Sequence, residues 1–425
     1  MQKKWVGARL VPALAVALSL IAAACGGKSD SGGKASADEG STAANASVLG
    51  TPNAATGAPV KIGLISNGVG QGFDQAIDTP VAKATADWIN AYSGGIGGRP
   101  IQIVVCEDQS DPAKAADCAA QMISDNVVAV VYSSNGVYES SWRPLSAAGI
   151  PTFIQAVGTK SAGEEPKNTF IFNNAQASTI DGPLALALKH KAKVLSVISV
   201  DIPAATVNYT EGPGPKKIED AGVKLDLIPV PIGTPDMTVQ TQQLVHKNPD
   251  GAVNILGNDA FCIAALNGLK AAGYSGVISA NEQCITDNTI KGVGADYVKG
   301  IRVIAQVPLT DTQDPSTQLY TEIMHRWAPK EPVDATGTFM FLAMTGLDAA
   351  TAGLKGDVTP QSIIAAAKSM PWIEQPGSGG RHIRCNGKAD TTQPAVCSNA
   401  VLYATLDGQG KPANYEVLLD EKVPD

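Results

Sequence analysis

Seven cysteines constrain what this 425-residue chain can fold into more than any other residues. One ends a hydrophobic leader, and the other six form three pairs whose members are close in sequence. The pairs are Cys106 with Cys118, Cys262 with Cys284, and Cys385 with Cys397. Disulfides persist in oxidising compartments, although six cysteines leave several connectivities open. We expect the three local pairings, in a folded body outside the cytoplasm.

The N-terminus has the features of an export signal. Basic residues such as Lys3 and Arg9 precede a largely apolar segment that ends in small residues. This pattern is typical of a secretory signal peptide, here residues 1–24, and it is shorter than the roughly 20 apolar residues of a membrane span. Cys25 follows at once and resembles the cysteine of the bacterial lipoprotein lipobox. We expect Cys25 to carry a lipid anchor; the alternative is an ordinary exported protein with a chance cysteine in its leader.

Residues 25–58 have the composition of a flexible linker. The segment is rich in Gly, Ser, Ala, Asn, Thr and Lys and has no aromatic residue. Such a segment cannot bury enough apolar surface to offset the entropy lost on ordering. We expect a disordered tether that holds a folded body at the outer face of the cytoplasmic membrane.

Charge and residue spacing argue against nucleic-acid and metal binding. The net charge is −8, whereas nucleic-acid binding requires a basic stripe. A zinc site is the alternative use of the cysteines, but no CxxC-type spacing and no HExxH arrangement occurs. The four histidines are His190, His246, His325 and His382. We expect no nucleic acid, no metal and no cofactor.

The body of the chain alternates short apolar runs with amphipathic segments. Residues 60–65 form the first apolar run, and Thr79-Pro80 and Asp111-Pro112 are cap-plus-proline helix starts. Further apolar runs predict strands at 101–105, 127–132, 194–200, 224–230, 252–256 and 277–280. Repeated βα units predict an α/β fold with parallel sheets covered by helices on both faces.

The length of this region predicts two such open, Rossmann-like lobes. Segments near 170–172 and 301–307 are the expected crossings between them. The expected N-terminal lobe is 59–176 plus 306–372, and the expected C-terminal lobe is 177–305 plus 373–425. Ligands of open α/β sheets bind outside the carboxyl ends of the strands, so a ligand would lie in the cleft between the lobes.

Several segments together resemble a known family. They are 60–65, 86–99, 107–115, 149–151 and 271–273. Their sequences and separations resemble those of the leucine/isoleucine/valine-binding proteins, which are type I solute-binding proteins of ABC importers. The resemblance implies a clamshell of two α/β lobes joined by hinge strands, a small-molecule ligand and no catalysis. It also implies partners, namely an ABC permease and ATPase, for a protein that we expect to be a monomer.

The resemblance implies ligand contacts in the first lobe. The family's turn after the third strand, which holds the ligand's α-carboxylate, corresponds to Ser133, Ser134 and Asn135. Small donors at a helix N-terminus form an anion site, although plain helix capping is the alternative role. The family's next carboxylate contact falls at Val157 and, with a shift of one residue, Thr159.

In the second lobe, Asn258 stands where the family has a tyrosine, and no aromatic residue follows Asp201 before Tyr209. Glu282 or its neighbour Asn281 corresponds to the acidic residue that meets the ligand's ammonium; the alternative for Glu282 is a solvated loop residue. The expected apolar contacts, each of which could instead belong to a core, are Phe73 and either Phe339 or Phe341. Without the two aromatics the ligand stays open: a branched-chain or other amino acid, an amide, or a small carboxylate.

Two enzyme classes and a sensory receptor are the alternatives to a binding protein. A nicotinamide enzyme is suggested by the glycines at 68–72, but Phe73 stands where the dinucleotide fingerprint requires glycine. A serine hydrolase requires a Gly-x-Ser-x-Gly motif, which does not occur. A ligand-sensing receptor ectodomain of the same fold remains the alternative to an importer's lipid-anchored binding protein.

Overall fold

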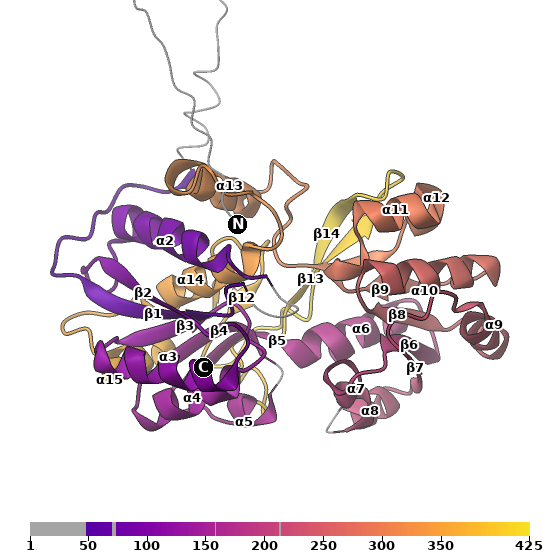
Figure 1. The fold of residues 1–425 in the computed structure, drawn as a ribbon, viewed down its shortest axis with the longest axis horizontal. Helices are drawn as coiled ribbons and strands as arrows, with labels where there is room; N and C mark the ends of the chain where they lie inside the picture. Colours follow the sequence, from indigo (N-terminus) through magenta and orange to yellow (C-terminus); the bar gives the residue numbers. More distant parts are fainter. Residues whose placement is uncertain (1–47, 70–73, 158, 212–213) are drawn as a thin grey trace, which may run out of the picture.

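The computed structural model describes residues 48–425 except 70–73, 158 and 212–213, and consists of two lobes that lie side by side (Figure 1). The N-terminal lobe is built on a five-stranded parallel sheet of order β2-β1-β3-β4-β5. Its strands are β1 (Val60–Ser66), β2 (Ile101–Glu107), β3 (Ala129–Tyr132), β4 (Thr152–Val157) and β5 (Thr169–Asn174). The parallel βα pattern predicted from the sequence is confirmed for this lobe.

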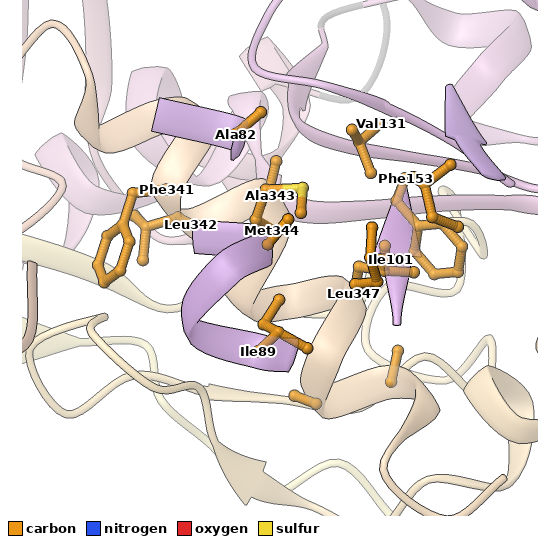
Figure 2. Packing of buried hydrophobic residues seen from close by; sticks show 14 of the residues in the cluster. Ala82, Ile89, Ile101, Val131, Phe153, Phe341, Leu342, Ala343, Met344 and Leu347 are labelled. Carbon is orange, nitrogen blue, oxygen red and sulfur yellow. The ribbon is translucent and has the colours of Figure 1, made fainter. Parts of the chain in front are cut away.

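Helices cover both faces of this sheet. They are α2 (Asp78–Trp88), α3 (Pro112–Ser124), α4 (Tyr138–Ala147), α5 (Lys160–Gly163), α13 (Pro315–Trp327), α14 (Thr338–Thr351) and α15 (Pro360–Ser369), with a π-helical turn η1 (Ile89–Ser93) after α2. Figure 2 shows α14 packed with α2 and the sheet in the main core, where Phe341 and Leu347 are fully buried. A Cβ added to Gly346 would lie 2.5 Å from the ring of Phe172, so a glycine is required for this close approach of α14 to β5.

The C-terminal lobe has a seven-stranded sheet of order β14-β13-β10-β9-β8-β6-β7. Its strands are β6 (Val194–Val200), β7 (Lys224–Val230), β8 (Ala252–Leu256), β9 (Ile278–Ala280), β10 (Arg302–Ala305), β13 (Val401–Leu406) and β14 (Pro412–Leu418). Strand β13 pairs antiparallel with both β10 and β14. The pairings among β6 to β10 are parallel.

Helices and short turns complete the C-terminal lobe. They are η2 (Ala177–Asp181), α6 (Gly182–Lys189), α7 (Pro203–Thr210), α8 (Gly214–Asp220), α9 (Thr238–Lys247), α10 (Asp259–Ala271), η3 (Glu282–Cys284), α11 (Asp287–Val293) and α12 (Ala295–Val298). None of the helices in the described part of the chain is both long and apolar enough to cross a membrane.

The three predicted disulfides are present in the structure. Cys106 is bonded to Cys118, Cys262 to Cys284, and Cys385 to Cys397. The first joins β2 to α3, and the second joins α10 to η3 across 22 residues of sequence. The second disulfide therefore holds the turn after β9 against the body of the C-terminal lobe.

Two helix starts illustrate how local sequence sets the elements. Asp111 caps α3, because its carboxylate accepts a hydrogen bond from the amide of Ala113 at 2.7 Å and Pro112 fits the first turn, as predicted. Helix α2 begins at Asp78, one residue before the predicted cap Thr79. The carboxylate of Asp78 turns inward instead of capping the helix.

The N-terminal boundary of the first lobe differs from the predicted one. Residues 48–58 were expected in the linker, but Leu49 is 1% exposed in the main core and the indole of Trp88 donates to its carbonyl at 3.0 Å. Asn53 also donates from its amide to the carbonyl of Ala91. The sequence prediction was wrong here because the average composition of the linker hid one short apolar stretch.

The last crossing between the lobes also differs from the predicted position at residue 373. The hairpin of β11 (Ile373–Glu374) and β12 (His382–Ile383) leads into a segment whose Cys385 and Cys397 lie in the core of the N-terminal lobe. The C-terminal tail returns to this hairpin, where Asp420 accepts from the amide of His382 at 3.0 Å. Strands of two residues carry no βα periodicity from which their lobe could be predicted.

Leu49 offers a test of the revised boundary. We expect Leu49→Ala to lower the free energy of unfolding by about 2 kcal/mol or more, because it empties a buried core position. Urea unfolding of the mature chain measures this. Leu188→Ala, at a leucine that is 47% exposed on α6, is the matched control and should change stability by roughly 1 kcal/mol or less. Equal effects of the two variants would show that residues 48–58 are not part of the folded lobe.

Candidate functional site

A pocket of about 240 Å³ lies between the two lobes. It is lined by residues of the N-terminal lobe, the C-terminal lobe and the connecting segment after β10. The first group includes Ala156, Asn173 and Phe339; the second includes Leu256, Asn281 and Glu282; the connecting segment contributes Gln306. Since β4, β5, β8 and β9 all end here, the pocket lies at the carboxyl edges of both sheets. The sequence predicted a ligand at this edge.

Asn281 and Glu282 come directly after β9, next to the disulfide at Cys284. The side-chain oxygen of Asn281 accepts from the amide of Gly257 at 3.2 Å, which fixes this turn against the end of β8. Burial raises the pKa of Glu282 to about 7, and the attraction of Arg381 opposes this rise. Within the described residues no hydrogen bond reaches the Glu282 carboxylate, so its oxygens remain available to a ligand.

Arg381 is a buried cation at the junction of the lobes, 5% exposed. Its Nε donates to the carbonyl of Ser378 at 2.9 Å and its Nη2 to the carbonyl of Gln306. Burial lowers the pKa of Arg381 to about 10, and the charges of Glu282 and Asp420 act in the opposite direction. Arg381 therefore supplies a buried positive charge that attracts the Glu282 carboxylate.

Two side chains of the turn after β3 (the β3 turn, residues 133–136) are directed into the protein. The Ser133 hydroxyl donates to Asp78 at 2.6 Å, and the Asn135 amide donates to Asp108 at 2.6 Å. The Ser134 hydroxyl is an acceptor in this turn, because its oxygen accepts a hydrogen bond from Gln75 Nε2 at 2.9 Å. Its own hydrogen is not used in that bond. Two of the three predicted donors are thus already used by buried carboxylates, and the Ser134 hydroxyl is not.

Asp78 anchors this arrangement beneath the turn. It is 1% exposed and accepts from both Ser66, at 2.9 Å, and Ser133. Burial raises its pKa to about 6, while the two hydroxyl bonds act in the opposite direction. The hydrogen of Ser133 is therefore oriented toward Asp78 and away from the cleft.

Of the other predicted ligand contacts, some lie in a core or at a helix start and one lines the pocket. Val157 is buried in an apolar cluster of the N-terminal lobe, and Thr159 directly precedes α5. Asn258 caps α10, accepting from the amide of Phe261 at 3.0 Å, and lines a second hollow beside the pocket. Phe341 is core, with its ring centroid 4.9 Å from that of Tyr320, whereas Phe339 lines the pocket. Phe73 lies outside the described residues, as does Cys25.

Three residues at the site were not predicted from the sequence. Gln155 Nε2 donates to Gln306 Oε1 at 3.3 Å, which joins β4 to the segment after β10, and Arg381 donates to the same segment. A signal for Gln155 was available, because an amide in the middle of an apolar strand is costly to bury without a partner. Arg381 sits in an irregular glycine-rich turn that has no such pattern.

Within the described ranges, no three His, Cys, Asp or Glu side chains are grouped so that they could hold a metal ion. The pocket is lined by one carboxylate, several amides and apolar side chains, and the guanidinium of Arg381 is bonded to the backbone of Gln306 beside it. This set is suited to holding a small polar molecule through hydrogen bonds and charge.

The fold is similar to that of known binding proteins. A search of curated protein sequences finds no match. Among solved structures, the isoleucine-bound branched-chain amino acid transporter substrate-binding protein of Streptococcus pneumoniae is 16% identical, with a TM-score of 0.59 over 85% of this chain and 99% of that one. An ABC transporter substrate-binding protein of Sphaerobacter thermophilus is 16% identical, with a TM-score of 0.67 over 86% and 99%.

A fatty acid ABC transporter substrate-binding protein of Thermomonospora curvata is 15% identical, with a TM-score of 0.62 over 88% of this chain and 97% of that one. These likenesses support the two-lobed fold. The family model described as periplasmic binding protein matches residues 59–397, which is most of the chain. The chain therefore belongs to the periplasmic binding protein family, with the type I clamshell fold.

Proposed function

We propose that this protein is a lipid-anchored solute-binding protein of an ABC importer. In this proposal it captures an amino acid of branched-chain type, or a related small carboxylate, in the cleft between its lobes and delivers it to a membrane permease powered by an ATPase. It binds and releases its ligand without chemistry. The observation that carries the proposal is the pocket shared by both lobes, with the carboxylate of Glu282 open to it.

Glu282 is the proposed partner of a ligand ammonium. An unpaired charge is costly to bury, and the raised pKa of Glu282 reflects this cost. An ammonium would favour the ionised carboxylate and form charge-assisted hydrogen bonds with it. The isoleucine-bound relative, by its description, shows that this fold can take an amino acid.

The proposed partner of a ligand carboxylate is Ser134, together with the backbone of the β3 turn. Because the Ser134 oxygen accepts from Gln75, its hydrogen is free to point to a ligand. The turn leads into α4, and the amides at a helix start favour an anion. Ser133 supports the turn from beneath through Asp78.

A ligand screen tests the function directly. We expect at least one amino acid, amide or small carboxylate to raise the thermal midpoint of the mature chain, since a ligand at 100 times its dissociation constant adds about 2.7 kcal/mol of stability. Ser134→Ala should then weaken binding by roughly 10- to 150-fold, the effect of one hydrogen bond to a charged group. Glu282→Gln should weaken the binding of ligands that carry an amine and leave the binding of carboxylates without an amine unchanged.

The matched controls for this screen are Ser369→Ala and Glu219→Gln, both at exposed positions far from the pocket. Equal loss of both ligand classes in Glu282→Gln would mean that Glu282 has a structural role. A screen without any ligand that stabilises the protein would contradict the proposed function itself.

Asp78 gives a pH-dependent prediction. Because its pKa is raised from 3.8 to about 6, the folded state holds this proton more tightly than the unfolded chain. The free energy of unfolding should therefore fall as the pH rises from about 4 to about 6, with roughly 3 kcal/mol from this group. Urea unfolding at several pH values should show a smaller fall in Asp78→Asn.

Asp348→Asn is the matched control for Asp78. The pKa of Asp348 is also raised to about 6 by burial, and its partner is Ser93, away from the cleft. Both variants should flatten the pH dependence of stability, but only Asp78→Asn should change ligand affinity, because only Asp78 orients Ser133. Unchanged affinity in both variants would show that Asp78 does not position the turn.

The proposed lipid anchor at Cys25 can be tested, although this residue lies outside the part of the chain that the structure describes. We expect Cys25→Ser to move the protein from the membrane fraction to the soluble fraction, because the thiol is the proposed site of acylation. Fractionation and N-terminal mass spectrometry measure this, with Ser29→Ala in the same segment as the control. A Cys25→Ser variant that stays with the membrane would refute the anchor.

A further inference from the structure

A second hollow, of about 540 Å³, lies on the C-terminal lobe beside the pocket. We call it the C-lobe hollow. Its apolar lining comes chiefly from the ends of β6 and β8 and the helices that follow them: Val200, Ile202, Ala205, Leu256, Ala260 and Phe261. It shares Thr179, Leu256, Asn281 and Gln283 with the pocket between the lobes, so the two spaces adjoin.

The hollow is a property of one lobe. Every residue that lines it lies between η2 and η3, within the C-terminal lobe. Movement of the lobes about the connecting segments therefore leaves the lining itself intact and can only change what covers it. Ile232 on its rim is 69% exposed, so this lobe presents a large apolar side chain that a ligand could cover.

Small side chains explain why the space is there. Ile202 directly precedes α7 and Ala205 lies in its first turn, while Asn258 and Ala260 lie at the start of α10, so no aromatic ring stands at these positions. The first aromatic after β6, Tyr209, is 2% exposed and donates its hydroxyl inward to the carbonyl of Thr179. Phe261 packs on Gly257, where an added Cβ would lie 2.4 Å from the ring.

From this arrangement we infer that the ligand is larger than a branched-chain amino acid and carries an extended apolar body. Its polar head binds at Asn281 and Glu282, and its body lies in the C-lobe hollow. The inference rests on the proposed function, since it describes the ligand of the same cleft. A hollow of this volume is in the range of sites that hold drug-sized molecules, and its apolar lining favours a hydrocarbon chain or ring.

A homologous series of amino acids with linear side chains tests chain length while the head stays constant. The series is norvaline, norleucine, 2-aminooctanoate and 2-aminodecanoate, with leucine as the reference. Binding to the mature, disulfide-bonded protein is measured by calorimetry. We expect affinity to rise by about fourfold for each methylene buried, so roughly 15-fold from norleucine to 2-aminooctanoate. A maximum at leucine or norleucine would overturn the inference.

Two variants locate the body of the ligand. Ala260→Phe fills the hollow from the start of α10, whereas Ala271→Phe places the same ring at the exposed far end of that helix. We expect Ala260→Phe to remove the gain from longer chains and to leave norvaline binding within about threefold, and Ala271→Phe to change neither. Thermal unfolding verifies that both variants fold. Unchanged binding of the long chains to Ala260→Phe would overturn the placement in the hollow.

Octylamine and octanoate, run in parallel, separate this inference from the proposed amino-acid ligand. If leucine binds and longer chains do not, the proposed function stands and the inference fails. If the amino acids fail but an eight-carbon probe binds and is lost in Ala260→Phe, the apolar body is supported and the amino-acid head is wrong. If no probe binds, the inference is refuted.

Discussion

Parallel strand pairing is the constraint on which the rest of this structure depends. Each parallel strand must be followed by a crossover, so the carboxyl ends of β1 to β5 collect at one edge of the first sheet, and those of β6, β8 and β9 collect at one edge of the second. The segments after β5 and β10 connect the two lobes next to these edges. Residues from distant parts of the chain, such as Ala156, Asn281 and Gln306, therefore line one pocket.

Four buried or partly buried charged side chains surround this cleft. Asp78 and Asp108 lie behind the β3 turn, and each accepts a hydrogen bond from a residue of that turn. Glu282 lines the pocket and lies within the electrostatic influence of Arg381, and burial shifts the pKa of each toward its neutral form. The carboxylates behind the turn have hydrogen-bond partners within the protein, whereas Glu282 has none among the described residues, which leaves its carboxylate open to a ligand.

Several features could be predicted from the sequence because they depend on local patterns. Alternating apolar runs and caps such as Asp111 identified the parallel α/β lobes, and close spacing identified the disulfides that the structure contains. The positions after β9 were also predicted, and Asn281 and Glu282 do line the pocket with Phe339. In each case the information lies within a short window or at the end of a recognisable strand.

The tertiary structure decided what depends on partners far away in the chain. Leu49 joins the core of the first lobe and its carbonyl accepts from Trp88, and the segment around Cys385 belongs to the first lobe because the same core contains that side chain. Ser133 and Asn135 donate inward because Asp78 and Asp108 lie beneath them, at sequence separations of 55 and 27. The sequence by itself determined the fold class, the preference for local cysteine pairs and the edge of the sheets at which the shared pocket lies. Hydrogen-bond direction, burial and the apolar hollow depend on three-dimensional neighbours, so only the folded structure could decide them.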